Sequence, residues 1–293
     1  MLDTTPTPQT LADYAVVRRA IDFVSSRRRE RPSIDEVAVN AGLTPMRLEQ
    51  VLERWAGLTA AAFLQAISVE RVRELLRKSG AALDEAGPTG HSGPGQPRDI
   101  FATHETLTLG DRGGDGLVLR NGFHPSPFGE AVVVMGPQGL AGLGFVDDDR
   151  EAALGDMRRR WPRARFLADA DATGAAARRA FDPRLWRPDA PLKLAMIGSD
   201  FDVLVWKTLL RVPMGRATTY SDIARKIGKP TAARAVGAAV GRNPISFVVP
   251  CHRALGRSGA LSGYYWGLAR KQAMIAWEAG GTVEGVGRVD AAM

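Results

Sequence analysis

The sequence predicts a multidomain α+β protein with an all-α N-terminal domain, a small α/β subdomain and a mainly helical C-terminal domain. The length of 293 residues suggests about two domains of average size. Apolar residues recur at helical spacing between residues 11 and 80 and again between 201 and 279. Short apolar runs between these two regions are typical of strands. We expect the three parts to span residues 1–110, 116–190 and 191–285.

Start and stop signals divide the first 80 residues into helices. A first helix from Leu11 ends before Pro32. Ser33–Glu36 then has the pattern of a capping box, which opens a second helix. Ala41–Leu43 is a turn that closes this second helix.

Thr44 caps a third helix, and Pro45 sits at its first position, where a missing N–H costs little. Its apolar face consists of Leu48, Val51, Leu52 and Trp55, and a long helix follows from about Ala60 to Lys78. The order helix, glycine turn, helix predicts a helix-turn-helix motif. An ordinary helical hairpin has the same pattern.

The middle of the chain contains a segment rich in proline and glycine, then a linker, and then a region of predicted strands. Residues 81–105 lie where a second helix-turn-helix would be expected. Their prolines and glycines allow only short helices. Residues 99–105 could form the end of a recognition helix. Residues 111–116 read as a linker. Strands are expected at 117–120, 131–135 and 140–146, followed by a helix at 151–161. We expect His124, just after the first strand, to be structural.

The C-terminal region predicts helices at 201–212, 219–224 and 231–240, the last two forming another helix-turn-helix pattern. An apolar run at 245–249 then leads into Pro250–Cys251–His252–Arg253.

Composition narrows the function classes. The net charge of +7 and a pI of about 10.0 suit a nucleic-acid partner, although a basic protein without one has the same balance. A single cysteine excludes an internal disulfide and a four-cysteine zinc site, and the four histidines show no metal spacing. We expect no metal, no cofactor and no membrane span, and a cytoplasmic location.

Cys251 is the candidate nucleophile. A lone cysteine is usually a small buried hydrophobe. Here the preceding proline restricts the backbone, and His252 and Arg253 are two possible cations, whose positive charge would favour the thiolate, the nucleophilic form.

The region from Phe201 to Glu278 resembles O6-alkylguanine-DNA alkyltransferases throughout. The resemblance is carried by six segments in order, namely Thr219–Ser221, Ala233–Gly237, Arg242–Pro244, Pro250–Arg253, Gly259–Tyr264 and Trp277–Glu278. Residues 33–78 resemble AraC-type DNA-binding domains, and 116–190 the small alkyltransferase subdomain. Together these resemble Ada-type proteins without their four-cysteine zinc domain. The resemblance implies a ribonuclease H-like α/β subdomain and a winged-helix-like catalytic domain.

The same resemblance implies roles for individual residues. Cys251 would accept the alkyl group, with His252 as its base through a water and Glu278 holding His252. Asn243 would fix the turn around the site, and Tyr220 would help neutralise the departing guanine. The pocket would be lined by Tyr264 and by backbone near Ala254 and Tyr265.

The DNA contacts are implied in the same way. The damaged base must be flipped out of the duplex, and Arg234 would fill the gap that it leaves. Small residues on the 231–240 helix suit a close approach to DNA, or equally a tight helix packing. In the N-terminal half, Arg47 and Gln50 would meet DNA, with Arg54 toward its backbone.

Three hypotheses follow. The first is a single-turnover methylated-DNA–protein-cysteine S-methyltransferase fused to a DNA-binding regulator, acting as a monomer on double-stranded DNA that carries O6-alkylguanine and on promoter DNA. The alternative is a transcription factor whose alkyltransferase half serves mainly as a damage sensor. The third is an inactive base-flipping protein, which usually lacks the acceptor cysteine that this chain has.

Overall fold

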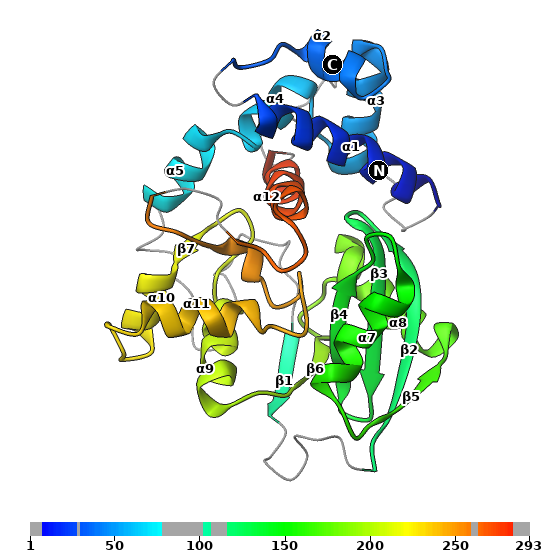
Figure 1. The fold of residues 1–293 in the computed structure, drawn as a ribbon, viewed down its shortest axis with the longest axis vertical. Helices are drawn as coiled ribbons and strands as arrows, with labels where there is room; N and C mark the ends of the chain where they lie inside the picture. The colour runs from blue at the N-terminus through cyan, green and yellow to red at the C-terminus, as the bar shows by residue number, and fades with distance from the viewer. Residues whose placement is uncertain (1–7, 28–29, 78–101, 107–115, 259–262, 284–293) are drawn as a thin grey trace, which may run out of the picture.

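The described part of the N-terminal region, residues 8–27 and 30–77, forms five helices. The computed structural model describes residues 8–27, 30–77, 102–106, 116–258 and 263–283 (Figure 1). The helices are α1 (Pro8–Ser26), α2 (Ile34–Asn40), α3 (Pro45–Ala56), α4 (Ala60–Ala66) and α5 (Val69–Arg77). The starts of α2 and α3 follow local chemistry, as predicted. Ser33 and Glu36 form the reciprocal capping box of α2, and Thr44 caps α3 with Pro45 at its start.

The predicted long helix over 60–78 is wrong. It is two helices, because Ser68 acts as a new cap: its hydroxyl accepts a hydrogen bond from the Arg71 amide at 3.1 Å. The break at residues 67–68 turns α5 away from α4 and toward the C-terminal part of the chain. The proposed second helix-turn-helix falls largely on residues 78–101, which lie outside the described residues.

A mixed six-stranded sheet forms the second layer. Its strands are β1 (Ala102–Thr106), β2 (Val118–Ser126), β3 (Gly129–Gly136), β4 (Gly139–Phe145), β5 (Arg165–Ala168) and β6 (Leu192–Met196), in the order β1-β6-β4-β3-β2-β5. β2, β3 and β4 form an antiparallel meander. The prediction that the first strand ends at residue 120 is wrong, because pairing with β3 continues β2 to Ser126 and His124 lies within it. Helices α7 (Arg150–Arg160) and α8 (Ala170–Phe181) pack on β2, β3 and β4.

The outer strands bring distant segments of the chain together. The expectation of a helix end at 99–105 is wrong, because residues 102–106 form a strand that pairs in parallel with β6. Its partner strand lies some 90 residues away in sequence. The residues around 102–106 therefore carry no local signal of this pairing. The sheet therefore includes β1, which precedes residue 110, and β6, which follows residue 190, so it extends beyond the expected range of 116–190.

The C-terminal region contains α9 (Asp200–Leu209), β7 (Thr218–Thr219), α10 (Tyr220–Lys226), α11 (Ala233–Gly241), a 3₁₀ turn at Cys251–Arg253, β8 (Ala254–Leu255) and α12 (Leu268–Val283). Capping boxes open α9 at Ser199 and α10 at Thr219. α11 packs against α9 and α10.

Helix α12 connects all three regions (Figure 1). It packs against α1, α3 and α4 and against the 3₁₀ turn that carries Cys251. Gly280 makes this contact possible, because a Cβ there would lie 1.9 Å from the Ala56 carbonyl oxygen at the end of α3. The Trp55 indole also donates to the Pro127 carbonyl at 2.7 Å, which ties α3 to the β2–β3 turn. None of the helices in the described residues is long and apolar enough to cross a membrane.

Candidate active site

The backbone before Cys251 is folded tightly around Asn243. The buried Asn243 amide donates to the Val249 carbonyl at 2.9 Å, and its oxygen accepts from the Ile245 amide at 3.0 Å. Phe247 has a φ of +68°, and the Val248 amide reaches the Ser246 carbonyl at 2.9 Å across it. Such a γ-turn is strained for a side chain of this size and persists only where its surroundings enforce it. The sequence from 243 to 250 therefore holds Cys251 in one orientation.

A second tight turn places the sulfur. The Cys251 amide donates to the Val249 carbonyl at 2.7 Å, across Pro250 with its restricted φ of −80°. The cysteine is only 5% exposed. Its Sγ lies 3.8 Å from the Tyr264 hydroxyl and 3.9 Å from the Ser246 hydroxyl. Two hydroxyls thus lie near the sulfur.

His252 and Glu278 form a buried pair directly behind the cysteine. His252 Nε2 lies 2.7 Å from Glu278 Oε1, and the Arg253 guanidinium contacts the same oxygen at 2.8 Å. The Gly215 amide donates to the other carboxylate oxygen at 3.2 Å. On the opposite side, the Phe247 ring stacks on the imidazole with centroids 5.7 Å apart. The imidazole is therefore held on one face by Phe247 and at its Nε2 edge by Glu278.

The charge states follow from burial and pairing. Burial lowers the pKa of His252 below 6.5, although Glu278 partly offsets this, so the imidazole is neutral at pH 7. Burial alone would raise the pKa of Glu278, but Arg253 and His252 together hold it at about 2. Within the described residues, His252 Nδ1 is buried without a hydrogen-bond partner. A neutral imidazole with a free ring nitrogen beside a thiol is equipped to act as a base.

Lys271 is a second buried cation at the site. It lies on α12, is 1% exposed, and donates to the Ala254 carbonyl at 2.8 Å. Burial lowers the pKa of Lys271 to about 8, and negative charge on Cys251 works against that lowering. Its ammonium also lies 5.9 Å from the centroid of the Tyr264 ring. Lys271 thus places positive charge where a thiolate forms.

Two tyrosines face the sulfur. Burial raises the pKa of Tyr220, at the start of α10, and negative charge on Cys251 adds to this. For Tyr264 the same two causes raise the pKa well above 10. Both tyrosines are therefore protonated at pH 7 and able to donate a hydrogen bond beside the cysteine.

Positive charge gathers on the region that carries this site. Residues 191–283 contain thirteen lysines and arginines against four acidic residues, whereas residues 8–77 contain eleven against nine. Arg234 is exposed on α11, beside the exposed small residues Ala235 and Ala238. A basic surface next to a buried nucleophile suits a polyanionic substrate.

Comparison with known proteins shows which family has this site. Residues 200–280 match the family described as "6-O-methylguanine DNA methyltransferase, DNA binding domain". The chain is 32% identical over 254 residues to "Regulatory protein ada" of Salmonella typhimurium, covering 83% of this chain and 69% of that protein. The chain belongs to the Ada family. A methylated-DNA–protein-cysteine methyltransferase of Mycobacterium bovis is 51% identical over 87 residues, which are 30% of this chain and 53% of that one.

Among solved structures, the crystal structure of Mycobacterium tuberculosis OGT in complex with DNA is similar, with 32% identity and a TM-score of 0.44. The match covers 55% of this chain and 92% of that one.

In this Ada-family chain, several predicted site residues do lie together. Cys251, His252, Glu278, Asn243 and Tyr264 are joined by the contacts above, and the Ala254 carbonyl holds Lys271. Tyr265 points elsewhere: its hydroxyl donates to Asp156 on α7 at 2.5 Å. The structural role expected for His124 also agrees with its contact to the Thr173 hydroxyl at 2.8 Å.

The three candidate DNA-binding residues of the N-terminal region, Arg47, Gln50 and Arg54, differ in their contacts within the protein. Arg47 and Gln50 are exposed on α3 and hydrogen-bonded to each other at 2.9 Å. Arg54 is engaged by Asp13 of α1, with its two nitrogens 2.8 and 2.6 Å from the carboxylate oxygens. The hydrogen bond to Asp13 raises the pKa of Arg54. Its charge is thus largely matched inside the protein.

Sequence reasoning missed Lys271, Ser246 and the contact of Arg253 with Glu278. The one available signal was the position of Lys271 seven residues before Glu278, which puts both on one face of α12 after two helical turns.

Proposed function

We propose that this protein is a single-turnover DNA repair methyltransferase that moves the alkyl group of O6-alkylguanine in DNA to Cys251. The observation that carries the proposal is the buried Cys251 thiol beside a neutral His252 that is paired with Glu278. Membership of the Ada family and the matched alkyltransferase DNA-binding domain support it.

The chemistry begins with removal of the thiol proton. His252 Nδ1 accepts it through a bridging water, and Glu278 and Lys271 stabilise the resulting imidazolium and thiolate. The thiolate attacks the alkyl carbon in line, forming the S–C bond. The bond from that carbon to O6 breaks, and its electron pair stays on the guanine. Tyr220 donates a proton to the guanine and is reprotonated by the His252 imidazolium through solvent, so that in the net reaction the thiol proton moves to the base.

Positioning supplies most of the acceleration. Fixing sulfur and alkyl carbon in line is worth up to about 7–11 kcal/mol, which exceeds what a larger thiolate fraction provides. The γ-turn at Phe247 and the Asn243 hydrogen bonds provide that fixation. The product is a thioether, and thiols do not reverse it, so each molecule reacts once.

DNA binding is assigned to two surfaces. In the catalytic region, which we take as winged-helix-like residues 191–285, α11 enters the duplex and Arg234 occupies the space of the flipped base, at a cost of a few kcal/mol for unstacking. Tyr264 and the backbone near Ala254 and Tyr265 line the pocket. The sheet at 116–190 is assigned as the ribonuclease H-like subdomain, with β1 and β6 added at its edge.

The N-terminal helices are assigned as an AraC-type domain that binds promoter DNA through Arg47 and Gln50. The charge distribution favours repair as the main activity, because residues 8–77 are nearly neutral and Arg54 is engaged by Asp13. The cytoplasmic location stays a prediction.

The test is the fate of the damaged base. A duplex with one O6-methylguanine is incubated with excess protein, digested to nucleosides and analysed by chromatography. The proposal expects O6-methylguanine to disappear and guanine to appear in equal amount, up to one per protein molecule. Continued turnover by a small amount of protein, or no restored guanine, would contradict it.

A further inference from the structure

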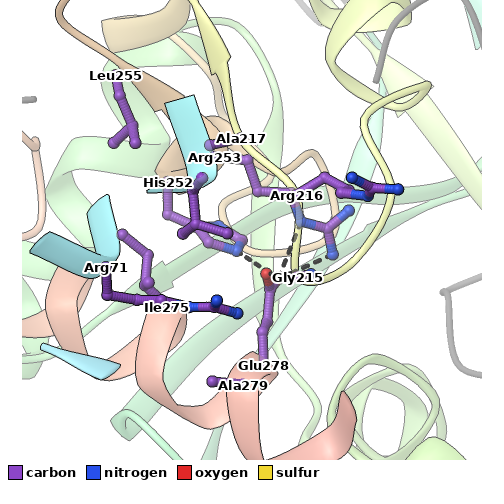
Figure 2. Close-up of a pocket in the computed structure, with 11 residues that line it drawn as sticks. Arg71, Gly215, Arg216, Ala217, His252, Arg253, Leu255, Ile275, Glu278 and Ala279 are labelled. Carbon is purple, nitrogen blue, oxygen red and sulfur yellow. Dashed lines mark hydrogen bonds and ion pairs between the residues drawn. The ribbon is translucent and has the colours of Figure 1, made fainter. Parts of the chain in front are cut away.

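A small cavity lies behind the catalytic pair (Figure 2). Its walls include His252, Arg253 and Glu278 from the site, Arg216 from the loop before β7, and Arg71 and Leu75 from α5. Cys251, Tyr220 and Tyr264 do not line it, so it does not open onto the sulfur. It has room for about one water molecule. The rear wall of the His252–Glu278 pair is thus made in part by a helix of the N-terminal region.

The contact between α5 and the catalytic region is apolar and closed. Val72 and Leu75 are 1% and 7% exposed and form one cluster with Ala217, Leu255 and Ile275. Ala217 directly precedes β7, Leu255 lies in β8, and Ile275 lies on α12 one turn before Glu278. Leu75 belongs to both the cluster and the cavity wall, so it separates the relay from solvent on that side.

We infer that α5 is a positioning element of the alkyl-transfer site, in which Leu75 seals the rear of His252 and Glu278 and so sets the lowest pH at which His252 works as a base. The inference rests on the proposed function. It gives the N-terminal helices a part in repair that is separate from any contact with DNA.

The physical link is hydration. Burial is the largest cause of the lowered pKa of His252, so opening the rear wall to water raises that pKa toward 6.5. The charged groups facing the pair are Glu278 and Lys271 from α12, Arg253 from the 3₁₀ turn, Arg216 from the β7 loop and Arg71 from α5, whose guanidinium bonds Glu74 at 2.8 Å. On the substrate side, His252 adjoins Cys251. None of these is removed by a change at Leu75.

The experiment compares Leu75→Ala with Val37→Ala in the full chain. Val37 is equally buried, but α2 packs only on α1 and α3 among its main contacts, so its truncation weakens the N-terminal region without touching the relay. The rate of alkyl transfer from free O6-benzylguanine, followed by intact-protein mass, is measured from pH 5.5 to 8.5. The free base removes DNA binding from the readout.

We expect Leu75→Ala to lower the ratio of the rates at pH 6 and pH 8 by up to about 4-fold, which is the fall in the neutral fraction of the base at pH 6 if its pKa rises fully to 6.5. Val37→Ala should keep the wild-type ratio, and Leu75→Met, which refills the wall, should restore it. An unchanged ratio in Leu75→Ala, or equal slowing at every pH, overturns the inference.

A second readout does not depend on catalysis. The chain has four histidines, so the His252 ring can be followed by NMR titration. Leu75→Ala should raise the pKa of His252, and Val37→Ala should not. If wild type transfers no alkyl group, the proposed function fails, whereas transfer with an unmoved His252 titration refutes this inference alone.

Discussion

The Glu278 carboxylate accepts hydrogen bonds from His252, Arg253 and the Gly215 amide, so its ionised form is tied to the folded state. Its pKa is 4.5 in its ordinary state and about 2 in the fold. A lowered carboxyl pKa stabilises the folded protein above about pH 4.5, and this contribution is lost as the pH falls toward 2. The lowered pKa of His252 acts in the same direction below pH 6.5, because the unfolded chain then binds the proton more strongly.

Glu278→Gln should therefore be destabilised most at neutral pH. Removing one partner of a buried ion pair costs about 3–5 kcal/mol. Urea midpoints at pH 7 and at pH 3.5 measure it. The gap between variant and wild type should narrow at the lower pH, and a gap of constant size would show that Glu278 is not the linked group.

For individual residues, the sequence was enough to identify the candidate reactive side chains, but not all of the side chains that contact them. Cys251, His252 and Glu278 stand in short recognisable segments. Lys271 and the Arg54–Asp13 fork depend on how α12 and α1 are placed, which only tertiary packing decides. The resemblance to AraC-type domains directs Arg54 toward the DNA backbone, and the sequence alone gives no sign that Asp13 engages it.

Among the elements, α3 and α11 carry the two proposed DNA contacts. Arg47→Ala and Gln50→Ala should reduce preference for a promoter sequence while alkyl transfer is retained. Footprinting on the preferred site, with transfer from O6-methylguanine DNA measured in parallel, tests this. Glu53→Ala, on the same exposed face of α3, is the matched control. A footprint that survives both changes would rule out α3 as the reading helix.

For α11, Arg234→Ala should slow repair of duplex DNA by roughly ten-fold to a few hundred-fold, because the flipped base loses its replacement in the stack. Reaction with free O6-benzylguanine needs no flipping and should change little. Part of the loss is phosphate attraction, which shrinks as salt rises. Rates on both substrates at two salt concentrations separate these effects. Equal slowing on both substrates would mean that Arg234 shapes the pocket instead.

Elements that depend on interactions between residues close in sequence were predicted more accurately than elements that depend on distant pairing. The capping boxes at Ser33 and Thr219 are local, and the helices begin where those residues predict. The strand at 102–106 depends on pairing with β6, so its sequence was misassigned to a helix. The break at Ser68 had a local signal in the serine itself, but the continuous apolar spacing on either side outweighed it.

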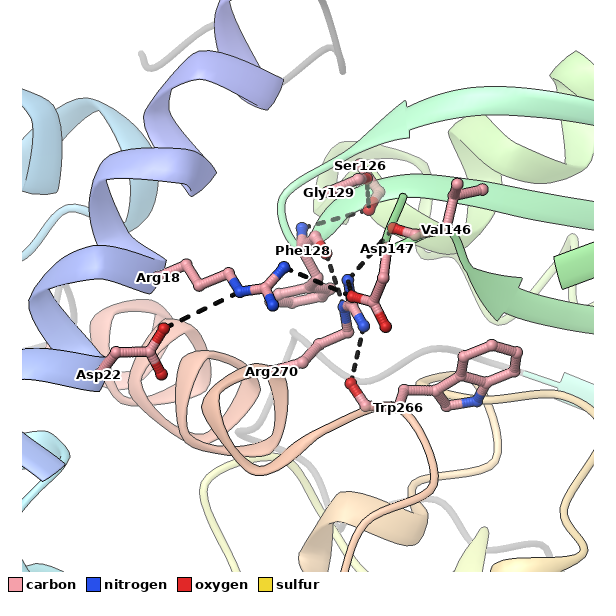
Figure 3. Close-up of polar contacts among 9 residues, drawn as sticks. All are labelled: Arg18, Asp22, Ser126, Phe128, Gly129, Val146, Asp147, Trp266 and Arg270. Atoms are coloured by element: carbon pink, nitrogen blue, oxygen red, sulfur yellow. Dashed lines mark hydrogen bonds and ion pairs between the residues drawn. The ribbon is translucent and has the colours of Figure 1, made fainter. Parts of the chain in front are cut away.

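Across the whole molecule, α12 makes the N-terminal helices, the sheet and the catalytic turn one packed unit. Arg270 on α12 shows this best: its guanidinium donates to the Phe128 carbonyl at 2.9 Å and the Trp266 carbonyl at 2.7 Å, and pairs with Asp147 at 3.0 Å (Figure 3). Arg18 of α1 reaches the same Asp147 oxygen at 3.4 Å. This linkage predicts that changes at the α3–α12 contact affect the stability of the whole chain.

Gly280→Ala and Gly281→Ala test that coupling as a matched pair. The new Cβ at 280 meets the Ala56 carbonyl oxygen and must separate α3 from α12, at a cost of about 1–3 kcal/mol. At 281 the nearest atom is Met214 Sδ at 3.7 Å, an ordinary contact, so the helix gains up to about 1 kcal/mol. Urea unfolding followed by tryptophan fluorescence should move in opposite directions. A neutral Gly280→Ala would show that α3 does not pack on α12 in solution.

The central claim is that Cys251 itself becomes alkylated, once and irreversibly. Intact-protein mass spectrometry after mixing with O6-methylguanine DNA tests it most directly, because Cys251 is the only thiol in the chain. The account predicts a gain of one methyl group per molecule, located on the Cys251 peptide, with no further gain on longer incubation. Cys251→Ala should bind the same DNA and keep its unmodified mass. A methyl group on the Cys251→Ala protein, or on another residue of the wild type, would contradict the account.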